Sequence, residues 1–196
     1  MEKAVDPVPI IRDYYPPGST AYEVLVRHGE QVAEKALAVS ERLASGLADT
    51  AFLYEAAMLH DIGIFLTDTP SLDCCGRQPY IRHGVLGREL LEARGLHRHA
   101  LVCERHVGVG LSLRDIQGQG LPLPERDMRP VTLEEEIVCY ADKFFSKSTR
   151  PDPAARSIPE IVALLGRHGA PQARRFQAWA RRFDNGGTTA AAPQPE

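Results

Sequence analysis

The chain has 196 residues, which is room for one domain with short extensions. Its composition, 43% hydrophobic and 25% charged, is that of an ordinary globular protein and excludes a fibrous or wholly disordered chain. A formal charge of -3 lacks the positive excess with which nucleic-acid-binding proteins hold phosphates, so we expect no nucleic-acid partner. No apolar run approaches the length of a membrane-spanning helix, and the cysteines form no spaced pairs. We therefore expect a cytoplasmic protein that does not bind membranes.

Helices are expected to begin after a short N-terminal arm. Residues 1–18 contain four prolines and a glycine, and because proline lacks a backbone donor and fixes its own φ, we expect an extended arm. Apolar residues recur at helical spacing over 19–47, and the segment 50–62 is apolar nearly all round, until Gly63 interrupts it. These two segments predict one amphipathic helix and one buried helix.

The middle of the chain alternates helices with two irregular stretches. Proline, glycine and small polar residues predict a loop over 67–79, and loops of that length in compact domains often act as lids. Helical patterns follow over 80–94 and 97–107. A second stretch rich in glycine and proline, over 112–130, is expected to be irregular.

Capping boxes mark two helices in the last third of the chain. A hydroxyl residue followed three positions later by glutamate predicts helices that begin after Thr132 and Ser157 and run to about residues 148 and 167. A last amphipathic helix is expected over 171–183, and the tail 186–196 is expected to be disordered.

The fold class predicted from these elements is all-α, because no alternating run is long enough for a sheet. We expect a helical bundle in four parts. They are an arm (1–18), the main domain (19–150), C-terminal helices packed on that domain (151–185) and a disordered tail (186–196).

Histidines and aspartates interrupt the apolar faces of several predicted helices. They are His28, His60, Asp61, His83, His106 and Asp142. A lone buried histidine is more often a hydrogen-bonded core residue than a ligand. Burying several imidazoles with two carboxylates, however, costs several kcal/mol per unpaired ion, and a bound cation offsets that cost. The set therefore predicts a metal site.

The doublet His60-Asp61 can serve one site only where its helix ends, since adjacent side chains project roughly 100° apart on a helix. Gly63 provides that end. The run His60-Asp61-Ile62-Gly63 matches the HDIG form of the doublet that names the HD superfamily of metal-dependent phosphohydrolases. Over about residues 20–150, the chain resembles this superfamily, whose domain is a helical bundle.

The other ligands of the superfamily have counterparts in this sequence. His28 and Asp142 match the remaining ligands of its mononuclear form, and His83 and His106 match the additional histidines of its binuclear members. The resemblance implies that Asp61 is catalytic and bridges two metals. In that arrangement His28, His60 and Asp142 complete one metal and His83 with His106 the other.

One or two divalent transition metals are the cofactors that this ligand set implies. Nitrogen and carboxylate ligands favour Fe, Mn, Co, Ni, Zn or Mg over copper(I) or an iron-sulfur centre. Two such metals can ionise a water at neutral pH and bind phosphoryl oxygens. The resemblance therefore implies hydrolysis of a phosphate ester by a metal-bound hydroxide.

The substrate contacts are less defined, because this chain departs from the family at one position. Many HDIG proteins follow the motif with a lysine that contacts phosphate, and here that position is Ile64. The basic residues nearest the motifs are the candidates for this contact. They are Arg77, Arg82, Arg105 and Lys143.

The resemblance implies a small phosphorylated substrate, a nucleotide or a related metabolite, with a homodimer compatible with the sequence. Two alternatives remain open at this point. One is an HD-fold diiron oxygenase that acts on a phosphonate or polyol, which the missing lysine favours slightly. The other is a metal-stabilised regulatory module without catalytic activity.

Overall fold

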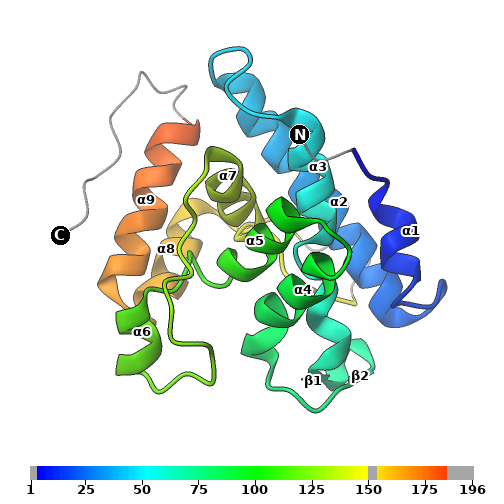
Figure 1. Ribbon diagram of the computed structural model, residues 1–196. Coiled ribbons are helices and arrows are strands. Elements are labelled where there is room, and N and C mark those ends of the chain that lie inside the picture. The colour runs from blue at the N-terminus through cyan, green and yellow to red at the C-terminus, as the bar shows by residue number, and fades with distance from the viewer. Residues whose placement is uncertain (1–3, 150–153, 185–196) are drawn as a thin grey trace.

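The computed structural model describes residues 4–149 and 154–184, and its fold is all-α (Figure 1). The α-helices are α1 (Pro7–Arg12), α2 (Thr20–Arg42), α3 (Thr50–Leu59), α4 (His83–Glu92), α5 (His97–Arg105), α6 (Leu113–Gly118), α7 (Leu133–Asp142), α8 (Ile158–Gly166) and α9 (Ala170–Asp184). The short elements are the 3-10 helices η1 (Ile62–Leu66), η2 (Pro70–Leu72) and η3 (Tyr80–Arg82) and the strands β1 (Asp68–Thr69) and β2 (Cys74–Cys75). The predicted tail, 186–196, lies outside the described residues. Among the described helices, none is long and apolar enough to cross a membrane.

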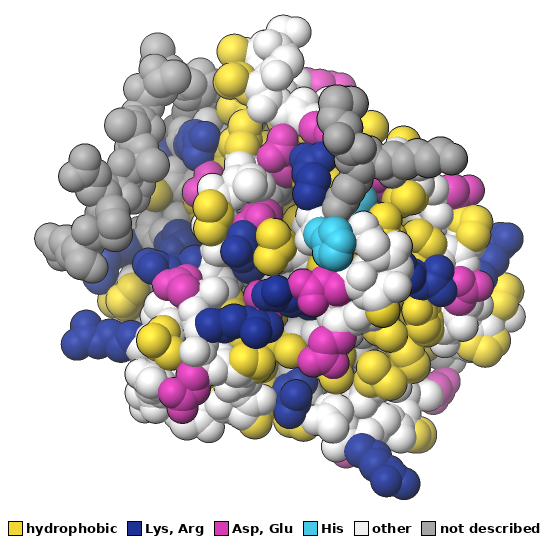
Figure 2. Space-filling view, viewed as in Figure 1, with side chains coloured by type: hydrophobic (Ala, Val, Ile, Leu, Met, Phe, Trp, Pro, Cys, Tyr) yellow, Lys and Arg dark blue, Asp and Glu magenta, His cyan; other side chains and the backbone are white. Residues whose placement is uncertain are grey.

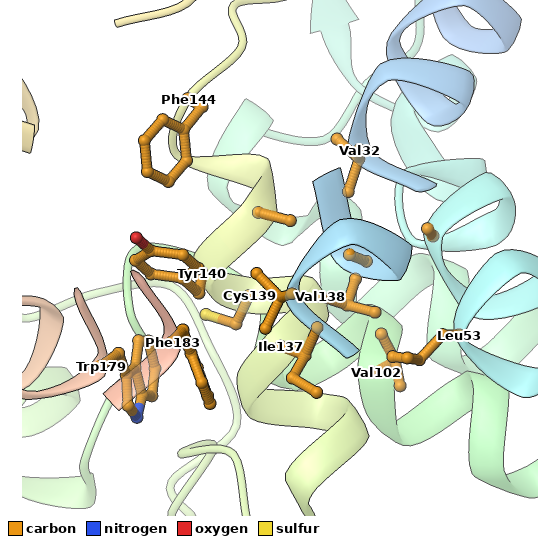
Figure 3. Packing of buried hydrophobic residues seen from close by; sticks show 14 of the residues in the cluster. Val32, Leu53, Val102, Ile137, Val138, Cys139, Tyr140, Phe144, Trp179 and Phe183 are labelled. Carbon is orange, nitrogen blue, oxygen red and sulfur yellow. The ribbon is translucent and has the colours of Figure 1, made fainter. Parts of the chain in front are cut away.

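The larger hydrophobic cluster joins α2, α3 and α7 to the C-terminal helices (Figure 3). Tyr140 of α7 stacks on Phe176 of α9 with ring centroids 5.1 Å apart, and its hydroxyl donates to Asp184 Oδ2 at 2.8 Å. Lys35 of α2 also pairs with Asp184, at 3.4 Å. The C-terminal helix is therefore fixed to the rest of the fold by apolar packing and by polar contacts at its end.

The N-terminal arm is not extended, contrary to the expectation for 1–18, because residues 7–12 form α1. Pro7 stands at the first helical position, where a missing N–H costs nothing, and the Asp6 side chain accepts from the backbone N–H of Val8. Ile11 and Tyr15 are buried in a second hydrophobic cluster with residues of α2, α3 and η1. The prolines therefore begin a helix that covers the core.

The hydroxyl of Tyr15 ties this segment to the turn after the histidine–aspartate doublet. It donates to the carbonyl of Ile62 at 2.9 Å and accepts from the N–H of Phe65 at 3.0 Å. Tyr15→Phe is expected to destabilise the protein by about 1–3 kcal/mol in urea unfolding, because two backbone groups lose their partner. Tyr22→Phe is the control, since among the described residues the hydrogen bond of the Tyr22 hydroxyl is to the exposed Arg12, at 3.3 Å. Equal losses in the two variants would contradict the assigned role.

The stretch 112–130 contains a helix that the sequence analysis did not predict. Ser112 and Asp115 form a capping box that begins α6, with the Asp115 carboxylate accepting from the Ser112 N–H at 2.9 Å. The box at Ser157 is present as predicted. The box at Thr132 is only half formed, because Glu135 instead accepts from the N–H of Val131 at 2.7 Å.

Three helices end at least three residues earlier than the sequence pattern predicted. The helix expected over 19–47 ends at Arg42, the one over 50–62 at Leu59, and the one that was to reach residue 148 at Asp142. The segment 67–79, expected to be a loop, contains η2 and the two-residue strands β1 and β2, which pair antiparallel. After α3 the apolar pattern continues because the next turn, 60–64, is buried too, whereas the turn after α2, 43–49, is mostly exposed.

Candidate metal centre

Six buried polar side chains from five segments of the chain meet at one place. They are His28, His60, Asp61, His83, His106 and Asp142. Four of them stand at helix ends: His60 is the C-cap of α3, His83 begins α4, His106 is the C-cap of α5 and Asp142 ends α7. The early helix ends therefore bring these side chains together, as the sequence analysis required of the doublet.

The first group contains two histidines and two carboxylates. His28 Nε2 lies 3.0 Å from Asp142 Oδ1 and 3.4 Å from Asp61 Oδ2. His60 Nε2 lies 3.1 Å from Asp61 Oδ2 and 3.4 Å from Asp142 Oδ1. The two nitrogens and two oxygens thus surround a common point.

The second group uses the other oxygen of Asp61. His83 Nε2 and His106 Nε2 each lie 3.3 Å from Asp61 Oδ1. These two nitrogens are 3.0 Å from each other. Asp61 therefore belongs to both groups, with one oxygen facing each.

Three of the rings are oriented by the backbone of their own helical turn. The Nδ1 atoms of His60, His83 and His106 contact the carbonyls three residues earlier at 2.6, 2.7 and 2.7 Å. A carbonyl only accepts, so each Nδ1 carries a proton and donates. In the neutral ring the unprotonated Nε2 then points into the cluster. Such second contacts are typical of metal-binding histidines.

The polar atoms of the two groups are better arranged to bind cations than to hydrogen-bond with one another. His60 Nε2 and both oxygens of Asp61 are buried without a hydrogen-bond partner among the described residues, although charged groups lie within 3.4 Å. The two Nε2 atoms of His83 and His106 face each other as acceptors at 3.0 Å. Asp61 Oδ1 lies 3.3 Å from these two nitrogens, so three acceptors face one another, which is unfavourable without a cation. Divalent cations bind this set of nitrogen and carboxylate ligands. The site therefore can hold metal.

The charges of the cluster follow from burial and from its carboxylates. Burial lowers the pKa of His106 to about 3 and, with help from the Lys147 ammonium, that of His28 to about 4. Burial opposes the charged form of His60, but the charges of Asp61 and Asp142 raise its pKa to about 9. His28 and His106 are thus neutral near pH 7, the form in which imidazole binds a metal.

Gly63 allows the turn after the doublet to lie against α4. A Cβ at this position would come within 2.2 Å of the His83 carbonyl oxygen and 2.4 Å of the Gly87 nitrogen. The turn that carries Asp61 and the helix that carries His83 therefore touch backbone to backbone. The glycine of the HDIG motif sets the distance between the two groups.

Two lysines neutralise the carboxylates, and the sequence analysis missed one of them. Lys143 Nζ lies 2.6 Å from Asp142 Oδ2 and donates to the His106 carbonyl at 3.2 Å. Lys147 Nζ lies 2.8 Å from Asp61 Oδ2, and its side chain is only 15% exposed. Its only signal in the sequence is its place shortly after Asp142, in a segment that the analysis assigned to the same helix.

A cavity of about 500 Å³ opens beside the first group. Asp142, Lys143 and Lys147 line its end at the cluster, together with Tyr80, whose ring lies 4.6 Å from that of His83. Residues of the segment 67–79 line another side, so this segment stands at the rim of the site, as its place after the motif predicted.

The four basic residues named as substrate contacts have different surroundings. Lys143 lines the cavity. Arg105 is bound to both oxygens of Glu135 at 2.9 and 2.8 Å. Arg77 is exposed on the segment before η3, and Arg82 is half-buried with no hydrogen-bond partner for Nε among the described residues. Their contact with a substrate stays a prediction.

Known proteins resemble much of this chain. Residues 25–146 match the family model described as HD domain. An uncharacterised protein of Methanocaldococcus jannaschii is 35% identical over 62% of this chain and 70% of its own length. Proteins named tRNA (cytidine(56)-2'-O)-methyltransferase from Picrophilus torridus and Thermoplasma volcanium are 32% and 31% identical over 64% and 66% of this chain. This chain spans only 33% and 34% of those two proteins. The HD domain of the L. monocytogenes phosphodiesterase PgpH matches 91% of this chain, and 97% of its own, with a TM-score of 0.49 at 15% identity.

Proposed function

This chain belongs to the HD domain family, and from that premise we propose that it hydrolyses a phosphate ester of a small metabolite with the help of two divalent metals. One observation carries the proposal. Asp61 turns one oxygen to each of two groups of histidines, and in one of them two Nε2 atoms face each other at 3.0 Å. Two adjacent cation sites that share a carboxylate are the arrangement used for phosphoryl hydrolysis.

The cluster residues have different roles in the proposed site. His28, His60, Asp61 and Asp142 would hold one ion and Asp61, His83 and His106 the other. Divalent metals, when bound, lower the pKa of water and stabilise charge on phosphoryl oxygens. Lys143 orients Asp142 from its other oxygen, at 2.6 Å.

The cavity supports a small substrate. Its volume of about 500 Å³ lies within the range of small-molecule sites. On the face shown in Figure 2 acidic and basic side chains are interspersed, and the formal charge of the whole chain is -3. Both observations favour a nucleotide or another phosphorylated metabolite over a nucleic acid or a membrane as partner.

The test is metal analysis of protein purified without oxygen, followed by a screen of nucleotides, sugar phosphates and phosphonates. We expect metal near two ions per chain and release of phosphate that stops on chelation, returns with added metal and does not need oxygen. Turnover that requires both iron and oxygen would replace the proposal with an oxygenase. Bound metal without turnover of any compound would replace it with a regulatory module.

A further inference from the structure

The cavity beside the cluster has two chemically different ends. Its polar lining includes Lys143 and Lys147, which contact the carboxylates of the cluster, and Arg156. On the side of α8 it is lined by apolar residues. They are Ile161, Leu164 and Leu165, with Leu72 and Phe145 nearby.

Lys147 is placed to meet an anion that enters the cavity. Its ammonium lies 2.8 Å from Asp61 Oδ2 and 3.7 Å from Asp142 Oδ1, and the residue lines the cavity. Lys143 also has two contacts, to Asp142 and to the His106 carbonyl. Arg156 donates to the carbonyls of Lys143 and Phe145 and forms no ion pair with any described carboxylate. The three cations Lys143, Lys147 and Arg156 therefore outnumber the two carboxylates, Asp61 and Asp142, with which the lysines pair.

The apolar end is built by the part of the chain beyond the matched family segment. The match to the HD domain ends at residue 146, whereas Lys147, Arg156 and the whole of α8 follow it. Leu164 is 39% exposed in a helix whose neighbours Ile161 and Leu165 are buried. An apolar side chain left partly open at the wall of a cavity offers surface to a ligand.

We propose that this cavity is the substrate subsite, in which Lys147 contacts the anionic phosphoryl group and Leu164 of α8 contacts the organic group. The substrate class is then a phosphate monoester of a compact alcohol with an apolar or aromatic portion. This inference deepens the proposed function and rests on it for the reaction. The binding step it describes can be measured without turnover.

Calorimetric titration of the Mn²⁺-loaded protein with two phosphonates tests both ends of the cavity. Methylphosphonate offers the anion alone, and phenylphosphonate adds an aromatic group. Lys147→Met is expected to weaken both by about tenfold, because a charge-assisted contact is lost. Leu164→Ser is expected to weaken phenylphosphonate about three- to fivefold and to leave methylphosphonate unchanged.

Matched controls separate these effects from general damage. Lys35→Met removes a lysine that does not line the cavity, and Leu113→Ser changes a leucine of similar exposure, 38%, on α6. Both are expected to bind like the wild type. Lys147→Arg keeps the charge and is expected to keep most of the affinity. Metal content is measured for every variant, since Lys147 also contacts Asp61.

The possible outcomes test the role of Lys147, the role of Leu164 and the proposed reaction separately. If Lys147→Met holds the same metal and binds both phosphonates like the wild type, the lysine only neutralises carboxylates and the inference is wrong. If Leu164→Ser weakens the binding of both phosphonates equally, or of neither, the assignment of Leu164 to the organic group is wrong. This test of the apolar end does not depend on whether Lys147→Met folds. Wild-type protein that binds neither phosphonate overturns the subsite. Wild-type protein that binds both but hydrolyses no ester overturns the proposed function alone.

Discussion

Asp61→Ala is expected to lose nearly all bound metal and all hydrolytic activity, whereas His106→Ala is expected to keep a substantial fraction of its metal. The reason is geometric. Asp61 Oδ2 lies 3.1 Å from His60 Nε2 and Asp61 Oδ1 lies 3.3 Å from the histidines of the other group, so its removal affects both. His106 belongs to one group only. Metal analysis after gel filtration measures the stoichiometry of each variant.

The control for this pair is Asp127→Ala. Asp127 pairs with Arg129 through an exposed contact and lies outside both groups, so its metal content is expected to equal that of the wild type. Circular dichroism of metal-free Asp61→Ala separates loss of ligands from loss of fold. Wild-type metal content in folded Asp61→Ala would remove Asp61 from the shared position.

Gly63→Ala is expected to destabilise the protein by about 3 kcal/mol or more in urea unfolding with chelator present. The added Cβ would lie 2.2 Å from the His83 carbonyl oxygen and 2.4 Å from the Gly87 nitrogen, which are backbone atoms that cannot rotate away. The clash can be relieved only if the turn moves away from α4, and that movement also takes His83 away from Asp61. Metal content is therefore expected to fall in the same variant.

Gly118→Ala is the matched control, because a Cβ there meets nothing within 4 Å. Gly118 ends α6, and alanine is expected to leave stability unchanged or to raise it by about 0.5–1 kcal/mol. A Gly63→Ala variant as stable as Gly118→Ala would show that the turn and α4 do not touch as described.

The six cluster residues were recognisable in the sequence because polar residues on apolar stripes are rare. His28 and Asp142 each stand among apolar neighbours at helical spacing, and the doublet at 60–61 precedes a glycine. Helical periodicity shows which residues share the apolar face of a helix, so it identifies a polar residue that lies on the buried face. The all-α class followed from the same periodicity.

Lys147 and the cavity could not be found in this way, since both depend on where segments end and how they pack. The sequence pattern extended α7 to about residue 148, which would have placed Lys147 on a helix, whereas α7 ends at Asp142. The chain after that end turns Lys147 back toward Asp61. Likewise α1 was missed because proline excludes the middle of a helix and favours its first turn.

The side chains of the cluster come from segments that span residues 28 to 142. In small zinc modules, nearby ligands let the ion drive local folding. Apart from the adjacent His60, every other member of the cluster lies more than twenty residues from Asp61 along the chain, so the site is formed by tertiary contacts and not within one local segment. We therefore expect folding of the whole domain to bring the ligands together, so that a bound ion would stabilise the completed fold more than any single segment of it.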